Sequence, residues 1–206
     1  MKVHLLGDIH GDVKPVYNIL LNTPQNHKLI QLGDFGFRST YDLHLPKLPY
    51  DRLRILGGNH DEWPSLVKWQ HALPRYGFEK WGNTGVFWVA GAYSIDKSQR
   101  IEGADWWKEE ELNYKETDAC IEEYTTFAQD GQIDVVLSHD CPINVGLAVL
   151  GEWPKETHTS KLLYELWKIH EPREWYFGHH HKRFRKKVGN TMFRCLDINE
   201  SVMLEW

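Results

Sequence analysis

The sequence predicts an α/β fold in which strands and helices alternate along one chain of 206 residues. Short apolar runs that close on Gly, Asp, Ser or His recur along the chain, which is typical of buried strands. Helix candidates lie between these runs. A content of 41% apolar and 26% charged residues suits a single compact domain with a substantial core, and we expect residues 1–206 to form it.

Short apolar or β-branched runs give the expected strands, at residues 3–6, 29–32, 53–56, 86–89 and 135–137. The helix candidates span residues 16–21, 63–69, 108–129 and 160–169. The first of these helices follows Pro15, and proline is well tolerated in a first turn. The acidic stretch that follows Trp106 and Trp107 is expected to be a solvated, surface-exposed helix.

The pattern changes after His181. Residues 184–188 and 191–196 flank the dipeptide Gly189-Asn190, which predicts an antiparallel hairpin with a tight turn. A final strand is expected at residues 201–204. Strands alternating with helices and ending in a hairpin predict an α/β sandwich.

Composition excludes several classes of protein. The net charge of −5 disfavours a partner such as long nucleic acid, which is bound mainly through its phosphates. Three widely spaced cysteines argue against a disulfide framework and against a Cys-x-x-Cys zinc site. The chain opens without a signal-like apolar region and contains no run long enough for a membrane span, so we expect a cytoplasmic protein.

Polar side chains follow the apolar runs in five fragments. The fragments are Gly7-Asp8-Ile9-His10-Gly11, Gly33-Asp34, Gly58-Asn59-His60-Asp61, Ser138-His139-Asp140 and Gly178-His179-His180-His181. In an open α/β sheet the carboxyl ends of the strands form the ligand crevice, so fragments far apart in sequence can converge there. We therefore expect one site built from all of these fragments.

The donor atoms of this site suit metal ions. The candidate ligands are Asp8, His10, Asp34, Asn59, His139, His179 and His181. They can hold two ions if Asp34 bridges them, and the absence of thiolate favours Mn²⁺, with Fe²⁺, Zn²⁺ or Ni²⁺ as alternatives. Two ions about 3.5 to 4 Å apart can activate a shared hydroxide and neutralise a phosphoryl oxygen. The pattern thus predicts hydrolysis of a phosphate ester.

The fragments, in this order, resemble the calcineurin-like metallophosphoesterase superfamily, whose pattern is D-x-H, G-D, G-N-H-(D/E), H, G-H-x-H. The resemblance implies a four-layer sandwich of two mixed β-sheets flanked by helices. It also implies that one ion is held by Asp8, His10, Asp34 and His181, and the other by Asp34, Asn59, His139 and His179. Residues 91–100 are similar to small bacterial and phage members of the superfamily.

Three further residues are candidates for catalysis. His60 would donate a proton to the leaving oxygen, and Asp61 would orient its ring. The second block departs from the phosphoprotein phosphatase form G-D-x-V-D-R-G by losing the second Asp, whereas Arg38 keeps the position from which the family's arginine grips phosphate. A surface arginine is the competing interpretation.

The substrate is left open by the sequence. Gly-Asp-Ile-His-Gly and Arg38 favour a phosphatase acting on a small molecule or phosphoprotein, whereas the basic residues 182–183 and 185–187 favour a nucleotide or nucleic-acid phosphodiesterase. A non-catalytic protein-interaction scaffold with the same fold is the alternative from another class. A structural single-zinc domain is disfavoured because its usual cysteine ligands are absent.

Overall fold

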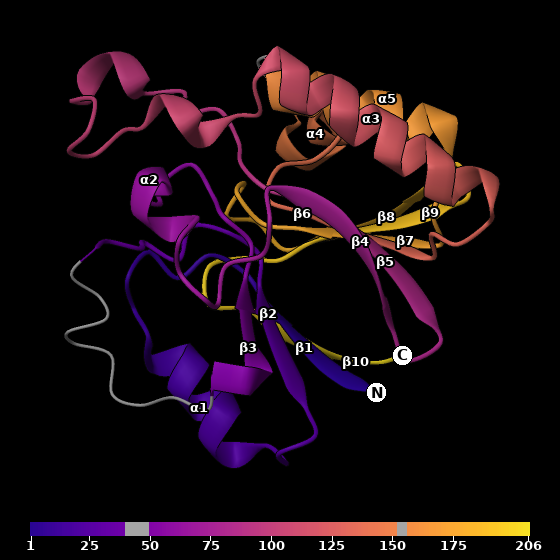
Figure 1. Ribbon diagram of the computed structural model, residues 1–206, viewed down its shortest axis with the longest axis horizontal. Coiled ribbons are helices and arrows are strands. Elements are labelled where there is room, and N and C mark those ends of the chain that lie inside the picture. The colour runs from indigo at the N-terminus through magenta and orange to yellow at the C-terminus, as the bar shows by residue number, and fades with distance from the viewer. Residues whose placement is uncertain (40–49, 152–155) are drawn as a thin grey trace.

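Two β-sheets pack face to face, with helices on their outer sides, in the computed structural model (Figure 1). The structure describes residues 1–39, 50–151 and 156–206. Both sheets are mixed, one with four strands and one with six. The predicted fold class, two mixed sheets flanked by helices, is confirmed.

The smaller sheet has the strand order β10-β1-β2-β3. Its strands are β1 (Lys2–Leu6), β2 (Lys28–Gln31), β3 (Leu53–Ile55) and β10 (Ser201–Glu205). β1, β2 and β3 run parallel, whereas β10 pairs antiparallel with β1. Because the parallel strands end at one edge, the chain segments that follow them meet there. Helix α1 (Lys14–Asn22) buries Val16 and Leu20.

The larger sheet has the strand order β4-β5-β6-β7-β9-β8. Its strands are β4 (Tyr76–Trp81), β5 (Thr84–Val89), β6 (Val135–Ser138), β7 (Glu174–Phe177), β8 (Phe184–Val188) and β9 (Thr191–Cys195). β5, β6, β7 and β9 are parallel, and β8–β9 is the predicted hairpin. The outer face is covered by α3 (Tyr114–Gln129), α4 (Ile143–Leu150) and α5 (His158–Ile169) (Figure 1).

The apolar core divides along these layers. One buried cluster contains residues of both sheets together with α1, including Leu5, Leu32 and Leu137. A second cluster lies under α3, α4 and α5 and includes Trp175 and Phe193. Burial of whole apolar side chains on this scale is the main favourable contribution to folding.

The acidic stretch after Trp107 differs from its prediction as one solvated helix. Residues Lys108–Glu110 form a single 3₁₀ turn, η4, and the α-helix begins only at Tyr114. Asn113 caps this helix through a reciprocal pair of hydrogen bonds with Glu116. Glu110 is buried, and its carboxylate accepts a hydrogen bond from the backbone nitrogen of Ser94, at 3.1 Å. The turn therefore packs against the body of the protein.

The remaining helices are short, and two strands, one α-helix and two 3₁₀ turns were not predicted. α2 spans only Trp63–Leu66, and the 3₁₀ turns η2 and η3 span Tyr50–Arg52 and Lys97–Gln99. Strands β4 and β7 and helix α4 are the additional elements. Within the described ranges, no helix has both the length and the apolar character that crossing a membrane requires.

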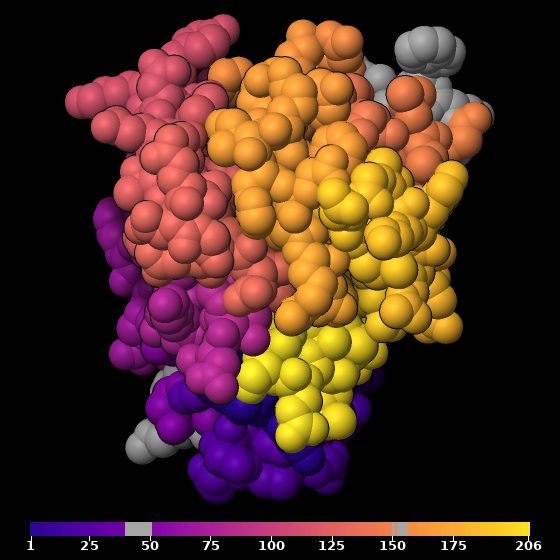
Figure 2. Space-filling model, turned by 90° about the vertical axis from the view of Figure 1, so that its right-hand side faces the viewer, coloured from indigo at the N-terminus to yellow at the C-terminus, as the bar shows by residue number. Residues whose placement is uncertain are grey.

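The first and last strands lie side by side. β1 and β10 are paired from Lys2–Glu205 to Leu6–Ser201, and the backbone nitrogen of Trp206 donates to the carbonyl of Met1 at 2.8 Å. Figure 2 shows the corresponding contact on the surface, where the yellow C-terminal residues lie directly against the indigo N-terminal ones. The smaller sheet is therefore completed by the last residues of the chain.

Candidate metal centre

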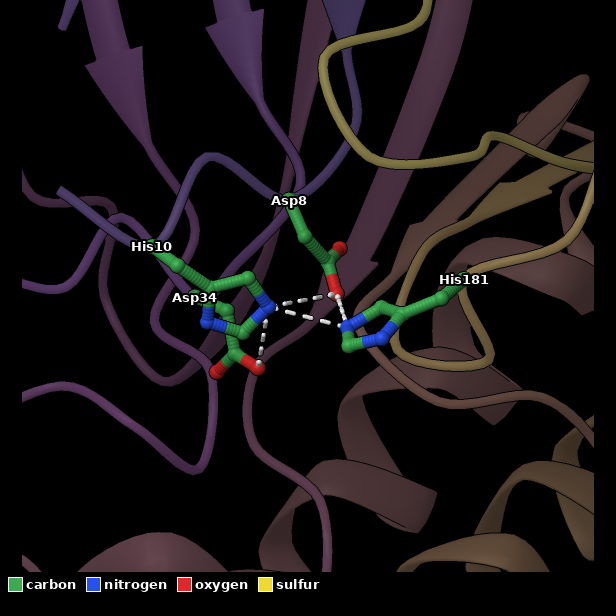
Figure 3. A group of neighbouring side chains, drawn as sticks. All are labelled: Asp8, His10, Asp34 and His181. Carbon is green, nitrogen blue, oxygen red and sulfur yellow. Dashed lines mark hydrogen bonds and ion pairs between the residues drawn. The ribbon is translucent and has the colours of Figure 1, made fainter. Parts of the chain in front are cut away.

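The first cluster of possible ligands joins the chain segments that follow β1, β2 and β7. Asp8, His10, Asp34 and His181 each offer a donor atom, and these atoms lie within 4.8 Å of one another. His181 Nε2 lies 3.0 Å from Asp8 Oδ2 and 2.9 Å from His10 Nε2. The two imidazoles and two carboxylates point toward a common centre (Figure 3).

The second cluster shares Asp34 with the first. Asp34, His139 and His179 offer donor atoms within 4.8 Å of one another. His139 Nε2 lies 3.2 Å from Asp34 Oδ1 and 3.1 Å from the side-chain oxygen of Asn59. The structure thus brings together all the predicted ligands, with Asp34 between the two clusters.

The backbone at these ligands is unusual. Four of the predicted ligands have positive φ angles: His10 (45°), Asp34 (53°), His179 (63°) and His181 (49°). Among the described residues other than glycine, only Asn199 shares this feature. Such conformations cost about 1 kcal/mol or more each and cluster at functional sites. The orientation of these side chains therefore comes at a cost in local backbone stability.

Two glycines leave room for the ligands. A Cβ atom at Gly58 would overlap with the Asp34 side-chain oxygen, and one at Gly178 would overlap with Oδ1 of Asp8. Each glycine directly precedes a predicted ligand in the chain. The sequence shows that glycines recur before the predicted ligands. The structure gives the physical reason, which is the close approach of the loops.

Hydrogen bonds behind the ligands fix their orientation. His139 Nδ1 donates to the carbonyl of Leu32 at 2.8 Å, which leaves Nε2 directed at the centre. The amide nitrogen of Asn59 donates to Ser94 Oγ at 3.0 Å, which leaves its oxygen for a cation. The backbone nitrogen of His179 donates to both carboxylate oxygens of Asp8, each at 3.1 Å. The arrangement suits cation binding from both sheets.

Burial and charge set the protonation of the second cluster. Burial alone raises the pKa of Asp34, but the adjacent His139 brings it below its usual value. Burial lowers the pKa of His139, and the charge of Asp34 outweighs this and raises it to about 10. Burial lowers the pKa of His179 to about 4. Carboxylates, imidazoles and an amide oxygen fit hard-to-borderline divalent ions.

His60 lies beside the clusters. Its Nε2 is 3.9 Å from Asp34 Oδ2, its backbone nitrogen donates to Asp34 Oδ1 at 2.8 Å, and its ring lies edge-on to that of His10, with ring centres 5.3 Å apart. Burial lowers the pKa of His60, whereas the charge of Asp34 raises it. The ring is a quarter exposed, so it is open to a substrate.

Asp61 contacts the backbone of two neighbouring loops. Its carboxylate accepts hydrogen bonds from the backbone nitrogens of Phe37, at 2.7 Å, and Gly58, at 2.8 Å. Burial, with the charge of Asp34, raises the pKa of Asp61 to about 6. Asp61 thus links the segments after β2 and β3, and its predicted action on the ring of His60 stays a prediction.

Arg38 lies against the same loop. Its Nη1 donates to the carbonyls of Phe37, at 2.9 Å, and His60, at 2.8 Å, and its guanidinium lies 4.8 Å from the ring centre of Trp107. Arg38 therefore supports the loop that carries His60. Its predicted contact with substrate phosphate stays a prediction.

His180 takes part in a contact that the sequence did not indicate. Its Nε2 lies 3.0 Å from Asp140 Oδ1 and 3.2 Å from the sulfur of Cys141. Burial raises the pKa of Asp140, but the hydrogen bond from His180 lowers it to about 2. The contact joins the loop after β6, which carries the predicted ligand His139, to the loop after β7, which carries the predicted ligand His179. The adjacency of Asp140 to His139 was its only signal in the sequence.

A family model described as calcineurin-like phosphoesterase matches residues 1–183. The chain belongs to the calcineurin-like phosphoesterase family. This family binds divalent metals, and the two clusters are candidate sites for them in this chain, beside a third possible group of Asp140, His179 and His180. The predicted resemblance is therefore confirmed. No curated protein sequence matches the chain.

Solved structures of calcineurin-like phosphoesterases and related proteins share the fold at low sequence identity. A Staphylococcus aureus protein named as a 5′-nucleotidase is 12% identical with a TM-score of 0.58, covering 99% of this chain and 50% of its own. The chain thus spans about half the length of that protein. Phosphopantetheinyl hydrolase from Mycobacterium tuberculosis is 17% identical with a TM-score of 0.55, covering 96% and 90%. GAP50, an anchor in the inner membrane complex of Plasmodium, is 12% identical with a TM-score of 0.56, covering 95% and 70%.

Proposed function

We propose that the protein is a metal-dependent phosphoesterase that hydrolyses a phosphate mono- or diester, with His60 as the proton donor. The observation that carries this proposal is the pair of ligand clusters that share Asp34, with the ring of His60 beside them. A single cluster would also suit a structural ion. A shared carboxylate with an accessible histidine beside it suits catalysis.

The ligand sets follow the two clusters. Asp8, His10, Asp34 and His181 would hold one ion, and Asp34, Asn59, His139 and His179 the other. Bound divalent ions, Mn²⁺ first with Fe²⁺, Zn²⁺ or Ni²⁺ as alternatives, supply an acidified water molecule and neutralise charge on the phosphoryl group. The chain itself orients the ester and supplies the proton for its leaving oxygen.

His60 suits the second of these tasks. Its backbone nitrogen and its ring both lie beside Asp34, so the imidazole has a fixed position relative to the clusters. Burial lowers the pKa of His60, and the charge of Asp34 offsets only part of this decrease. We infer that Nε2 of this ring holds the proton that passes to the leaving oxygen, and that Arg38, through its Nε or Nη2, contacts the phosphoryl group.

The class of ester and the role in the cell remain proposals. The phosphatase and phosphodiesterase alternatives differ in whether one or two organic groups must fit beside the clusters. A non-catalytic scaffold is the competing proposal, and the Plasmodium anchor protein shows only that this fold also occurs in a protein named for anchoring. The cytoplasm is the compartment that we propose, with a phosphate ester as the partner.

The decisive experiment measures Mn²⁺-dependent hydrolysis of para-nitrophenyl phosphate and its bis-ester by wild type and His60→Ala, with metal content determined for both proteins. We expect turnover to fall by roughly 10² to 10⁴ in the variant, the usual scale for a lost general acid, while the metal is retained. The preferred ester identifies the substrate class.

His4→Ala is the matched control, because His4 lies in β1 and contacts His27 at 3.0 Å rather than the clusters. Unchanged turnover in His60→Ala removes the assigned proton donor. Two bound ions without hydrolysis of either ester favour the scaffold, and a protein that binds no divalent ion contradicts the proposal as a whole.

A further inference from the structure

A cavity of about 370 Å³ opens beside the two ligand clusters. One side is formed by residues of the clusters and by His60. We call the largely apolar lining residues Tyr93, Ile95, Cys141, Ile143 and Gly146 the outer wall. The other lining residues are polar: Asp96, Asp140, His180, and Thr157 and Ser160, which bond to each other in the cap of α5. The volume is in the range of small-molecule sites, so the cavity has room for more than a phosphoryl group. The side chains of the outer wall therefore determine which organic group can bind beside the phosphoryl group.

The first part of the outer wall is tied to a predicted ligand. Ser94, which lies between Tyr93 and Ile95, accepts a hydrogen bond from the Asn59 amide at 3.0 Å and donates its backbone N–H to Glu110 at 3.1 Å. These bonds fix the segment after β5 next to the second cluster. This segment belongs to the part of the chain that extends beyond the sheets at the upper left of Figure 1.

The same segment lies close to the proposed proton donor. After burial and the charge of Asp34, the guanidinium of Arg100 is the next influence on the pKa of His60, which it lowers. Arg100 itself is held by Asp96, with contacts of 2.7 and 2.8 Å. Ile95 and His60 line the same cavity.

The second part of the outer wall follows β6. Cys141 is buried two positions after His139. Ile143 and Gly146 lie three residues apart in α4, so they share one face of that helix. Gly146 adds no side chain, which leaves space in the cavity. This part of the wall is apolar as well.

The cavity offers little to a charged group. Apart from histidines, the charged residues among the described residues that line the cavity are Asp34, Asp96 and Asp140. No Lys or Arg is among them. The nearby cations have other contacts, since Arg100 pairs with Asp96 and the ammonium of Lys97 lies 4.2 Å from the ring centre of Tyr93. A second anionic group, placed against the outer wall rather than at the clusters, would lose hydration without meeting a lining Lys or Arg among the described residues, which is unfavourable.

We propose that the outer wall binds the alcohol part of the ester, and that this part is an uncharged, largely apolar group of about the size of an aromatic ring. The inference rests on the proposed function and narrows its substrate class. It places the leaving oxygen at His60 and the organic group against Tyr93, Ile95 and Ile143. Esters whose leaving group carries further phosphates or carboxylates are poor substrates on this basis.

Two isoleucines of one segment provide a matched test. Ile95 is 76% exposed and lines the cavity, whereas Ile101 is 71% exposed and is not one of the lining residues. Because neither side chain is part of the core, substitution by lysine leaves the fold intact. Only Ile95→Lys places a cation beside the proposed leaving group.

The experiment uses the Mn²⁺-loaded protein and two phosphonates that cannot be hydrolysed, benzylphosphonate and 4-carboxybenzylphosphonate, with affinities measured by calorimetry. We expect wild type and Ile101→Lys to bind the neutral compound roughly tenfold more tightly, because the anionic one loses hydration in the cavity. Ile95→Lys should abolish or reverse this preference. Hydrolysis of benzyl and 4-carboxybenzyl phosphate is then compared in the same proteins.

Equal affinity of wild type for the two phosphonates, no binding of either one, or the same change in both lysine variants overturns the inference. Selective binding without hydrolysis of either ester supports the inference and contradicts the proposed function. Hydrolysis of both esters with equal kcat/KM supports the proposed function and contradicts the inference. The two claims therefore fail separately.

Discussion

Asp34 connects most of the features of the site. Its carboxylate belongs to both ligand clusters, lies 3.2 Å from His139, and accepts a hydrogen bond from the backbone of His60. Its backbone has a positive φ of 53°, which is uncommon outside glycine, although aspartate adopts it more readily than most residues. A single side chain thus links metal binding, the charge of the second cluster and the position of the proposed proton donor.

Arg38 is the residue whose role the structure leaves most open to experiment. If its guanidinium binds phosphate, Arg38→Ala should raise KM by about tenfold or more, since a charge-assisted hydrogen bond contributes about 1.5 to 3 kcal/mol. If it serves mainly to hold the carbonyl of His60, kcat should fall with little change in KM. Steady-state kinetics with the preferred ester separates these results.

Arg54→Ala is the control for this substitution, because the Nη1 of Arg54 donates to the neighbouring carbonyl of Leu53 in β3, at 3.0 Å, away from the clusters. Unchanged kcat and KM in Arg38→Ala show that neither role applies. Metal content should be equal in the three proteins, because Arg38 contacts no predicted ligand side chain.

The sequence predicted single residues of the site better than their surroundings. The ligands could be predicted because the resemblance rests on their types, order and spacing, and the structure brings them together. Two contacts could not be predicted: that of His180 with Asp140, and that of Asn59 with Ser94. Both join segments that are far apart in sequence. Asp61 holds backbone nitrogens, which a sequence pattern does not specify.

At the scale of elements, the site depends on the turns that follow the strands. β1, β2 and β7 each end just before a turn that carries a ligand with positive φ. The turns approach one another so closely that Gly58 and Gly178 have no room for a side chain. The turns, rather than the strands, therefore define where each donor atom lies.

Gly58→Ala should weaken metal binding. Its added Cβ would overlap with Asp34, and displacing a ligand or its support typically reduces metal affinity by roughly 10- to 100-fold. Gly77→Ala is the control, because its Cβ would lie 2.8 Å from the ring of Trp88 in β5, away from the site. That variant should lose about 1 to 3 kcal/mol of stability through overpacking and keep its metal affinity. Calorimetric Mn²⁺ titration and denaturant unfolding test both; equal metal affinities in the two variants contradict the expectation.

The elements that were not predicted share a lack of clear local pattern. β4 is an edge strand, and its exposed residues Glu79 and Lys80 interrupt the apolar pattern that predicts a buried strand. α4 is apolar over nearly its whole length, and a short apolar run of this kind does not distinguish a helix from a buried strand. β7 is only four residues long and directly precedes the last ligand block. Tertiary packing decides the structure of each.

At the scale of the whole molecule, the candidate metal centre lies where the two sheets meet. Asp8, Asp34 and Asn59 follow strands of the smaller sheet, whereas His139 and His179 follow strands of the larger one. An ion bound by both groups would link the sheets as well as serve catalysis. The prediction of one domain over residues 1–206 is consistent with this placement and stays a prediction.

Metal binding should therefore stabilise the whole fold. At a free Mn²⁺ concentration of about 100 times Kd, one bound ion adds about 2.7 kcal/mol, which raises Tm by roughly 5 to 10 °C for a chain of this size. A chelator should remove the increase. Thermal unfolding with and without Mn²⁺ measures this difference.

Asp34→Asn should abolish most of this Mn²⁺-dependent increase, since Asp34 belongs to both clusters. Asp130→Asn is the control, because Asp130 lies at the end of α3 and contacts Gln132. An equal increase in Tm for wild type and Asp34→Asn contradicts the assigned ligand.

The pairing of β1 with β10 has a consequence for synthesis on the ribosome. β1 is made before β10, so the outer edge of β1 lacks its partner until residues 201–205 have been synthesised. An uncovered strand edge can pair with another nascent chain. His179 and His181 are also translated late, so no ion can bridge the sheets until most of the chain has emerged. The smaller sheet thus gains its fourth strand only after residues 201–205 are made, and a nascent chain arrested before that point exposes the edge of β1.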